Sequence, residues 1–389
     1  MERTYEKTTV PSPSVAADGE QPSGKKPEPI IADTQDKSKS DDDVMKEHFR
    51  ALRELSRMND PSYLHTVSMS DLYETVYESR PPVIDGLLFA GTYLFAGAPK
   101  IGKSFLMAQL AYHVSTGTPL WGFEVHQGTV LYLALEDNNQ RLQNRMYRMF
   151  GTDGTENLHF ATFARHLDEG LEDQLRHFIE SHPDTRLVII DTLQKIRETG
   201  NGKCSYGADY DAVGKLKRFA DANGLCLLLV HHTRKQPSSD SFDLISGTNG
   251  LLGSADGAFL LQKEDRTSSN ATLELSGRDQ QEQRLYLVKD KDRLTWELDH
   301  VETELWKAPP DPILESVAKL VTRDAPEWTG SPTELAAALN ANLPANVLTK
   351  HLNVNASRLR NEYNIGYENK AKHEGRRIRL HYLIVAEVA

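Results

Sequence analysis

The sequence predicts an α/β fold, a doubly wound and mostly parallel sheet with an antiparallel edge, followed by a small C-terminal domain. Three observations support this prediction. A glycine-rich loop at residues 97–104 lies between a strand pattern and a helix pattern. Apolar strand patterns then alternate with helical patterns up to residue 232. Several short strands follow, and after a proline-rich linker the chain ends in helices and a strand pair.

The glycine-rich loop fits the phosphate-binding pattern G-x-x-x-x-G-K-[ST], and its flanks supply the structure that this pattern requires. Residues 92–96 are a short apolar run that is typical of a buried strand. Residues 104–115 carry apolar side chains at helical spacing, and Gly117 ends that pattern. Strand, glycine loop and helix therefore follow one another in the required order.

Each residue of the loop has an expected task. Gly97 and Gly102 permit backbone geometry in which consecutive N–H groups point at phosphate oxygens at a helix N-terminus. Lys103 is expected to reach the β- and γ-phosphates, and Ser104 to offer its hydroxyl to Mg²⁺. The candidate nucleotide-binding residues are Gly97, Ala98, Pro99, Lys100, Ile101, Gly102, Lys103, Ser104 and Phe105.

Length and composition limit the remaining possibilities. The 389 residues predict one large domain and a smaller one, and the formal net charge of -11 means that any nucleic-acid contact depends on a local basic patch. The only cysteines, Cys204 and Cys226, have no metal-ligand spacing, which favours a reducing compartment. No run is apolar enough to span a membrane and no signal pattern opens the chain, so we expect a cytoplasmic protein.

Composition divides the chain into five parts. Residues 1–43 are poor in apolar side chains and predict a disordered tail, and residues 44–65 contain the pattern of a short linker helix, which could equally bind a partner. The nucleotide-binding domain is expected at residues 66–306. A proline-rich linker at residues 307–312 separates it from a C-terminal domain at residues 313–389.

Two predicted strands end in acidic residues. Residues 128–137 form an apolar run that ends in Glu136 and Asp137, and a second run ends in Asp191. Open α/β sheets bind ligands at the carboxyl ends of their strands. We therefore expect Asp191 to help hold Mg²⁺ and Glu136 to orient and deprotonate the attacking water. The alternative is that Glu136 and Asp137 only cap the following helix.

A third core strand, residues 225–230, is followed by two histidines. His232 is the candidate sensor of the γ-phosphate, with Arg234 beside it; the alternative is a histidine with a structural role only. Residues 235–251 are rich in polar residues and predict a loop that contacts single-stranded nucleic acid. The alternative is an ordinary surface loop.

Short strands at residues 258–261, 272–275 and 284–288 predict the antiparallel edge of the sheet. Helix patterns at the C-terminus, with Ser331 as a cap and Pro332 at the first helical position, precede a strand pair. This order is typical of a winged-helix domain.

The C-terminal domain also carries the basic patch that the net charge requires. Eight Lys or Arg against three Glu lie between residues 347 and 382, a net charge of about +5. We expect duplex DNA to contact this patch. The candidate contacts are Lys350, Arg358, Arg360, Arg376 and Arg377.

Five motifs together carry a family resemblance. In order along the chain they are residues 94–104, 132–137, 190–195, 230–235 and 276–279. This ordered set resembles the RepA-type ATPases of the RecA superfamily, which are found on plasmids, phages and integrated mobile elements. The resemblance covers about residues 66 to 300. It implies a RecA-like, ring-forming ATPase, a homo-hexamer or another ring, that is related to replicative helicases.

The resemblance also implies two site residues. The strand-end glutamate that matches Glu136 is the catalytic base in that family, and an arginine from the neighbouring subunit reaches the γ-phosphate. Arg278 stands where that arginine is expected. The alternative for Arg278 is a surface arginine that pairs with Asp279 or Glu282.

The sequence therefore predicts a Mg²⁺-dependent ATPase that assembles on DNA and works as a helicase or helicase-like motor for a genetic element. The extra basic C-terminal domain leaves a second class open, a DNA-binding regulator or recombination factor that uses ATP as a switch. A small-molecule kinase is less well supported, because no lid with arginines and no second substrate pocket can be identified in the sequence.

Overall fold

A computed structural model describes residues 45, 60–64, 66–77, 80–197, 206–233, 241–245, 249–263, 265, 267–278, 280–303, 309–372 and 375–383. The predicted tail at residues 1–43 and all of the predicted linker helix except Met45 and residues 60–64 lie outside this set. The chain divides into a first unit, residues 1–67, and a second unit, residues 68–389. The elements below belong to the second unit.

The described residues contain a nine-stranded sheet with the order β3-β2-β4-β5-β1-β6-β7-β8-β9. Strands β1 to β6 run parallel, and the last three strands pair antiparallel at one edge, which confirms the predicted fold class. The strands are β1 (Gly91–Gly97), β2 (Thr129–Ala134), β3 (Leu158–Ala161), β4 (Thr185–Asp191), β5 (Cys226–His232), β6 (Gly257–Gln262), β7 (Asn270–Gly277), β8 (Gln283–Lys289) and β9 (Trp296–Val301).

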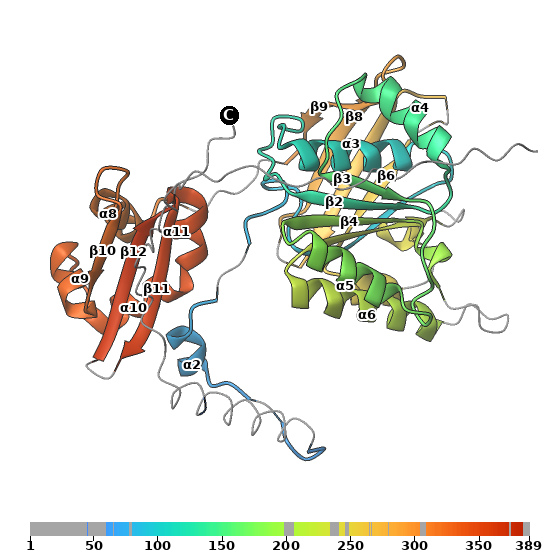
Figure 1. The fold of residues 1–389 in the computed structure, drawn as a ribbon. Coiled ribbons are helices and arrows are strands. Elements are labelled where there is room, and N and C mark those ends of the chain that lie inside the picture. The colour runs from blue at the N-terminus through green and yellow to red at the C-terminus, as the bar shows by residue number, and fades with distance from the viewer. Residues whose placement is uncertain are drawn as a thin grey trace, which may run out of the picture. The chain divides into compact units, whose positions relative to one another are not determined.

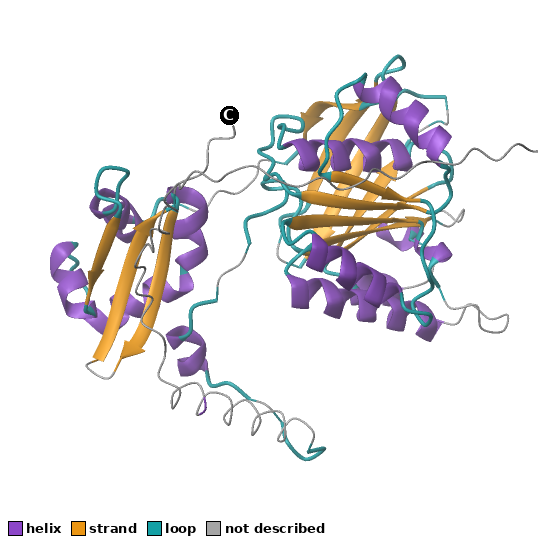
Figure 2. Cartoon of the chain, viewed as in Figure 1, coloured by secondary structure: helices purple, strands orange, loops and turns teal. Residues whose placement is uncertain are grey.

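Helices cover both faces of the sheet (Figures 1 and 2). Side chains alternate along a strand, so Tyr93 and Phe95 of β1 pack into one core while Leu94 and Ala96 pack into the other. Helices α3 (Lys103–Thr116) and α4 (Asn139–Phe150) cover the first face, and α5 (Leu171–Ser181), α6 (Tyr206–Asn223) and α7 (Asn249–Ser254) cover the second. None of the helices in the described ranges is long and apolar enough to cross a membrane.

The strand register brings the predicted site residues to one edge of the sheet. Gly97, the last residue of β1, pairs with His232, the last residue of β5. On the neighbouring pair of strands, Asp191 of β4 lies opposite Ala134 of β2. Because these strands are parallel, all four residues lie at the same carboxyl edge, where the glycine loop begins.

The antiparallel edge differs from the prediction in two ways: β6, which was expected to belong to it, runs parallel to β1, and β9 follows β8 as a strand that was not predicted. In β9 only Trp296 is fully buried, and Leu298 and Val301 pack against the same core while partly buried. The position of β9 depends on a distant side chain: the amide of Gln109 in α3 accepts from the Trp296 N–H at 2.8 Å and donates to its carbonyl at 2.9 Å.

A separate core forms the C-terminal domain, in which helices pack on a three-stranded antiparallel sheet with the order β10-β12-β11 (Figure 2). Ser331 caps the second helix in a capping box with Glu334, as its sequence predicted. The elements are α8 (Pro312–Leu320), β10 (Glu327–Gly330), α9 (Pro332–Ala338), α10 (Ala345–Val354), α11 (Ala356–Tyr363), β11 (Ile365–Lys372) and β12 (Gly375–Tyr382). Strand β10 is additional to the predicted helices and strand pair.

Helix α2 (Met69–Glu74) packs on this C-terminal domain, although it precedes the nucleotide-binding domain in sequence. The Asn353 side chain of α10 donates to the carbonyl of Tyr73 at 2.9 Å, and Val76 packs against the C-terminal core. The C-terminal domain thus consists of two segments of chain, one before and one after the sheet domain. The boundary predicted at residue 66 does not coincide with this packing.

Candidate nucleotide-binding site

The glycine loop connects the end of β1 to the start of α3 and leaves no room for side chains at its two glycines. A Cβ atom at Gly97 would lie 2.8 Å from the Leu261 carbonyl oxygen. Gly102 has a φ of +109°, and a Cβ there would lie 3.0 Å from the ring of Trp296, which is fully buried beneath it. The loop therefore presents backbone N–H groups at the N-terminus of α3, as a phosphate site requires.

Lys103 is buried at the centre of the site. Its Nζ atom donates to the carbonyl oxygens of Gly97 at 2.8 Å and Ala98 at 3.0 Å, and lies 3.2 Å from Nδ1 of His232. Burial lowers the pKa of Lys103 to about 8, although Asp191 and Glu136 oppose this shift. Burial and the neighbouring lysine charge lower the pKa of His232, so the neutral imidazole can accept from the ammonium.

The two predicted metal ligands lie side by side. The Ser104 hydroxyl hydrogen-bonds to Asp191, and the buried Tyr132 hydroxyl donates to Oδ2 of Asp191 at 2.9 Å. Burial raises the pKa of Asp191 in spite of these bonds. No group of three or more histidines, cysteines or carboxylates among the described residues could hold a metal by itself. A hydroxyl beside one carboxylate still fits Mg²⁺, which in such loops is held mainly by phosphates and water.

The geometry distinguishes the two acids that follow β2. Asp137 is mostly buried and forms an ion pair with Arg145 at 2.8 Å, with Arg141 at 3.9 Å. Glu136 is exposed, accepts one long hydrogen bond from the Thr192 hydroxyl at 3.4 Å, and has no ion pair with a described residue. Of the two acids that follow β2, Glu136 is therefore the one whose charge is not neutralised by a described cation.

One arginine of α4 lies beside the glycine loop and is largely shielded from solvent. The side chain of Arg145 is 14% exposed, and its guanidinium lies 5.1 Å from the ring centre of Phe105. Lys289 contacts the same ring at 4.3 Å, and Lys263 lies 5.2 Å from the ring of Trp296. Burial lowers the pKa of both lysines. Sequence reasoning missed these cations, because their distance along the chain gave no sign that they lie beside the loop.

Arg278 lies at the opposite edge of the sheet. It follows the end of antiparallel strand β7; its N–H donates to the Asp256 carbonyl at 2.8 Å and its guanidinium to the Gly253 carbonyl at 2.9 Å. Gly277, the residue before Arg278, pairs with Gly257 of β6, and Gly257 pairs with Tyr93 of β1, four residues before Gly97. At about 3.3 Å per residue, the separation along β1 is about 13 Å. Arg278 is not part of its own subunit's glycine-loop site.

Several predicted features lie outside the described residues. They include Asp279, Arg234 and much of the loop at residues 235–251. The other alternative partner of Arg278, Glu282, instead accepts from the Ser276 hydroxyl at 3.2 Å.

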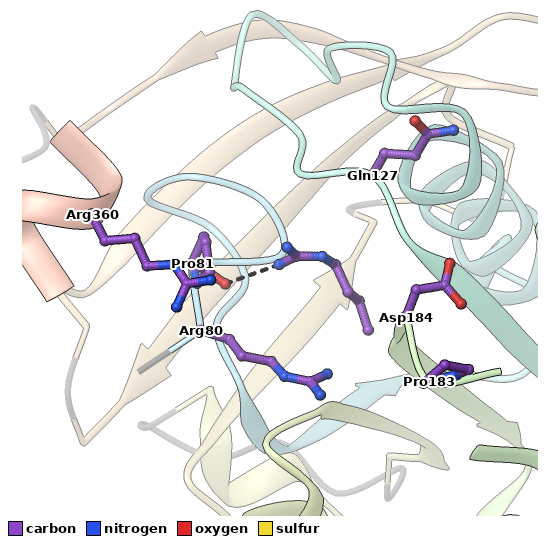
Figure 3. A pocket seen from close by; sticks show the side chains of 7 residues that line it. Arg80, Pro81, Gln127, Pro183, Asp184 and Arg360 are labelled. Carbon is purple, nitrogen blue, oxygen red and sulfur yellow. Dashed lines mark hydrogen bonds between the residues drawn. The ribbon is translucent and has the colours of Figure 1, made fainter. Parts of the chain in front are cut away.

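A second group of cations lies at the amino ends of the strands, away from the glycine loop (Figure 3). Arg186, the second residue of β4, donates to the Pro81 carbonyl at 3.3 Å, and Arg80 donates to the Thr185 carbonyl at 3.0 Å. Burial, and then the charge of Arg80, lower the pKa of Arg186. These arginines belong to a pocket that is distinct from the nucleotide site.

The predicted basic patch of the C-terminal domain is partly neutralised. Arg376 and Lys350 both pair with Glu74 of α2, the latter at 3.6 Å, and Arg358 pairs with Glu362 at 2.8 Å. The two other candidates, Arg360 and Arg377, are exposed. The expected set of free phosphate contacts is therefore reduced by Glu362, which lies within the patch, and by Glu74, which is far from it in sequence.

The sheet order, the glycine loop and the strand-end acids are features of a P-loop nucleotide-binding fold. Residues 58–238 match the model of a protein family described as "AAA domain". No curated protein matches the chain. The family match covers β1 to β5, and hence the loop, Glu136, Asp191 and His232.

Solved structures with similarity to the chain have low sequence identity. One is described as an ATPase domain, with 14% identity, 65% of this chain and 98% of that chain covered, and a TM-score of 0.47. A second is a DnaB-like replicative helicase, with 14% identity and a TM-score of 0.46; the match covers 66% of this chain and 72% of that chain. A third is a KaiC-like protein from Pyrococcus horikoshii OT3, with 13% identity and a TM-score of 0.42; the match covers 58% of this chain and 99% of that chain.

The different surroundings of the two acids predict different defects. We expect Glu136→Gln to bind ATP with near wild-type affinity but to lose about 10²-fold or more in kcat, because a general base contributes about that much. Asp137→Asn should keep most turnover and lower the Tm, because it weakens the buried ion pair with Arg145. Lys103→Ala should lose tight nucleotide binding. A near wild-type rate for Glu136→Gln would contradict the assignment and make Asp137 the next candidate.

The lowered pKa of Lys103 predicts pH-dependent binding. Phosphate oxygens favour the ammonium form, so above pH 8 binding of ADP must take up a proton, and the affinity should fall by up to about tenfold per pH unit. Below pH 7 Lys103 is already charged, so ADP binding should cause no proton uptake at this residue. Calorimetry of ADP binding at pH 7 and pH 9, in buffers of different ionisation enthalpy, measures this uptake. Equal proton release or uptake at both pH values would contradict the prediction.

Proposed function

We propose that the protein is a Mg²⁺-dependent, ATP-hydrolysing motor of the RepA type that acts on DNA, as a helicase or helicase-like enzyme, in the replication or mobilisation of a genetic element. The observation that carries this proposal is that the charged side chains at the carboxyl edge of the sheet differ in their partners. Lys103 and Asp191 are held by hydrogen bonds, whereas Glu136 has no ion pair with a described residue.

These residues have complementary roles in the proposed reaction. The loop backbone and Lys103 bind the phosphates of ATP, and Ser104 and Asp191 hold Mg²⁺ with its water ligands. The metal supplies positive charge that offsets the negative charge of the phosphates. Glu136 orients the attacking water and accepts its proton. His232, in contact with Lys103, responds to the occupation of the loop and passes that change to the chain that follows β5.

The proposed assembly is a ring, a homo-hexamer or another closed form, in which Arg278 acts in the neighbouring subunit. Its place at the edge opposite the loop supports this, since Arg278 and the loop of one subunit lie about 13 Å apart along β1. A guanidinium from the next subunit can then stabilise charge on the transferring phosphate. Single-stranded DNA is proposed to contact the loop at residues 235–251, and duplex DNA the C-terminal domain.

A specific observation favours a second candidate, an ATP-switched DNA-binding regulator without unwinding activity. The C-terminal domain contains segments from both sides of the ATPase domain in sequence, α2 and residues 309–383. A change of shape in the ATPase domain would therefore act on the C-terminal domain through two connections. That arrangement suits a switch as well as it suits a motor.

The motor and the switch differ in what DNA does to the ATPase. For a motor, we expect single-stranded DNA to raise the steady-state rate and a forked duplex to be unwound in an ATP-dependent manner. The Glu136→Gln variant is the control for unwinding without hydrolysis. ATP-dependent duplex binding with no stimulation by single strands and no unwinding would favour the regulator.

Arg278 offers a test of assembly. We expect Arg278→Ala to bind ATP and assemble normally but to lose about 10³-fold or more in turnover, the scale of an arginine supplied in trans. The decisive measurement mixes Arg278→Ala with Glu136→Gln subunits. Some interfaces then combine an intact Glu136 with an intact Arg278, so part of the activity should return. Native mass spectrometry confirms mixing, and a mixed assembly with no recovered activity would count against action across the interface.

A further inference from the structure

Helix α2 is attached to the C-terminal domain without burying an apolar face. None of its six residues is buried, and Met69, Leu72 and Tyr73 are exposed. Val76, just after the helix, is partly buried against the domain core. A helix this short is not stable by itself, so the contacts made by polar groups decide whether it stays on the domain.

The surface beneath α2 is polar and already well ordered. Asn353 of α10 is 1% exposed; its Nδ2 atom donates to the Tyr73 carbonyl at 2.9 Å, and its Oδ1 atom accepts from the Tyr367 hydroxyl at 2.9 Å and from Asn369 at 3.0 Å. The Oδ1 atom of Asn369 is buried and has no hydrogen-bond partner among the described residues. A surface of this kind can hydrogen-bond to another ligand when α2 is absent.

Glu74 adds a charged contact at the same place. It pairs with Lys350 of α10 at 3.6 Å and with Arg376 of β12. The Arg376 guanidinium lowers the pKa of Glu74, so the carboxylate is charged at neutral pH. All three side chains are between 31% and 44% exposed, so these ion pairs are accessible to solvent and to salt.

We propose that α2 is a displaceable acidic cover over a binding site for nucleic-acid phosphates, formed by Lys350, Asn353 and Arg376. Glu74 takes the place of a phosphate group in the covered state. This inference rests on the proposed binding of duplex DNA by the C-terminal domain and says which part of that domain is used and what regulates it.

Charge and chemistry favour a nucleic acid as the ligand. Lys350 and Arg376 come from a helix and from a hairpin strand and both reach Glu74, and Asn353 bonds to the same segment at Tyr73; these residue types commonly contact phosphates and sugars. A polyanion places several charges on the domain at once. The single carboxylate of Glu74 cannot match that number of contacts, so a duplex should displace it at low salt.

The test compares two variants of the full chain that remove one negative charge each from α2. We expect Glu74→Gln to bind a short duplex more tightly by about three- to tenfold at low salt, and to make the slope of log affinity against log salt steeper by about 1 to 2, the value for one or two additional phosphate contacts. Asp71→Asn, whose carboxylate bonds to Ser68 and not to the basic pair, should match wild type.

A second comparison links the effect to the site. In a Lys350→Ala/Arg376→Ala background, duplex binding should be weaker and Glu74→Gln should give no further gain. Hydrogen exchange provides a measurement that does not depend on charge removal: the amides of Leu72 and Thr75, which bond to backbone oxygens of this segment, should exchange faster in wild type when the duplex is bound.

Three results would overturn the inference. One is equal affinity for Glu74→Gln and Asp71→Asn, and another is unchanged or slower exchange in α2 at saturating duplex. Either of these leaves DNA binding by the C-terminal domain in place. Failure of the wild type and every variant to bind duplex at low salt would instead remove the proposed DNA-binding role of the domain, and the cover with it.

Discussion

The parallel pairing of β1, β2, β4 and β5 is the constraint on which the site depends. It brings Gly97, Ala134, Asp191 and His232 to one edge, although these residues are as far apart as 135 positions in sequence (97 to 232). A Cβ atom at Gly97 would lie 2.8 Å from the Leu261 carbonyl oxygen of β6, so the start of the loop favours glycine. A change in the strand register would separate Lys103, Asp191 and His232 at once.

The site is built around a buried ammonium group. Desolvation disfavours the charge on Lys103, and two backbone carbonyls, His232, Asp191 and Glu136 offset part of that cost. The surrounding charges are distributed unevenly: Asp137 is neutralised by Arg145, whereas Glu136 has no such partner among the described residues. Two adjacent acids on one chain thus have different electrostatic surroundings, although both are carboxylates.

In the C-terminal domain, by contrast, the charged side chains lie near the surface. Lys350, Arg358 and Arg376 pair with glutamates that contribute little stability but reduce the positive potential of the domain. One of these acids, Glu74, comes from α2, a segment on the other side of the sheet domain in sequence. The surface charge of the C-terminal domain therefore depends on a part of the chain that lies outside its own continuous segment.

The sequence by itself determined the P-loop, the strand-end acids and the alternation of strands and helices, because these depend on local patterns: glycine spacing, apolar runs and caps such as Ser331. It also identified Lys103, Ser104 and Asp191, which the structure brings together. Only the tertiary structure decided the rest. Strand β9 is held in place by Gln109 of α3, and Lys289 contacts the ring of Phe105, although each pair is far apart in the chain. The different surroundings of Glu136 and Asp137 result from the ion pair of Asp137 with Arg145. The partial neutralisation of the basic patch results in part from Glu74. Each of these contacts joins residues whose separation along the chain carries no periodic signal, so no sequence pattern could have predicted them.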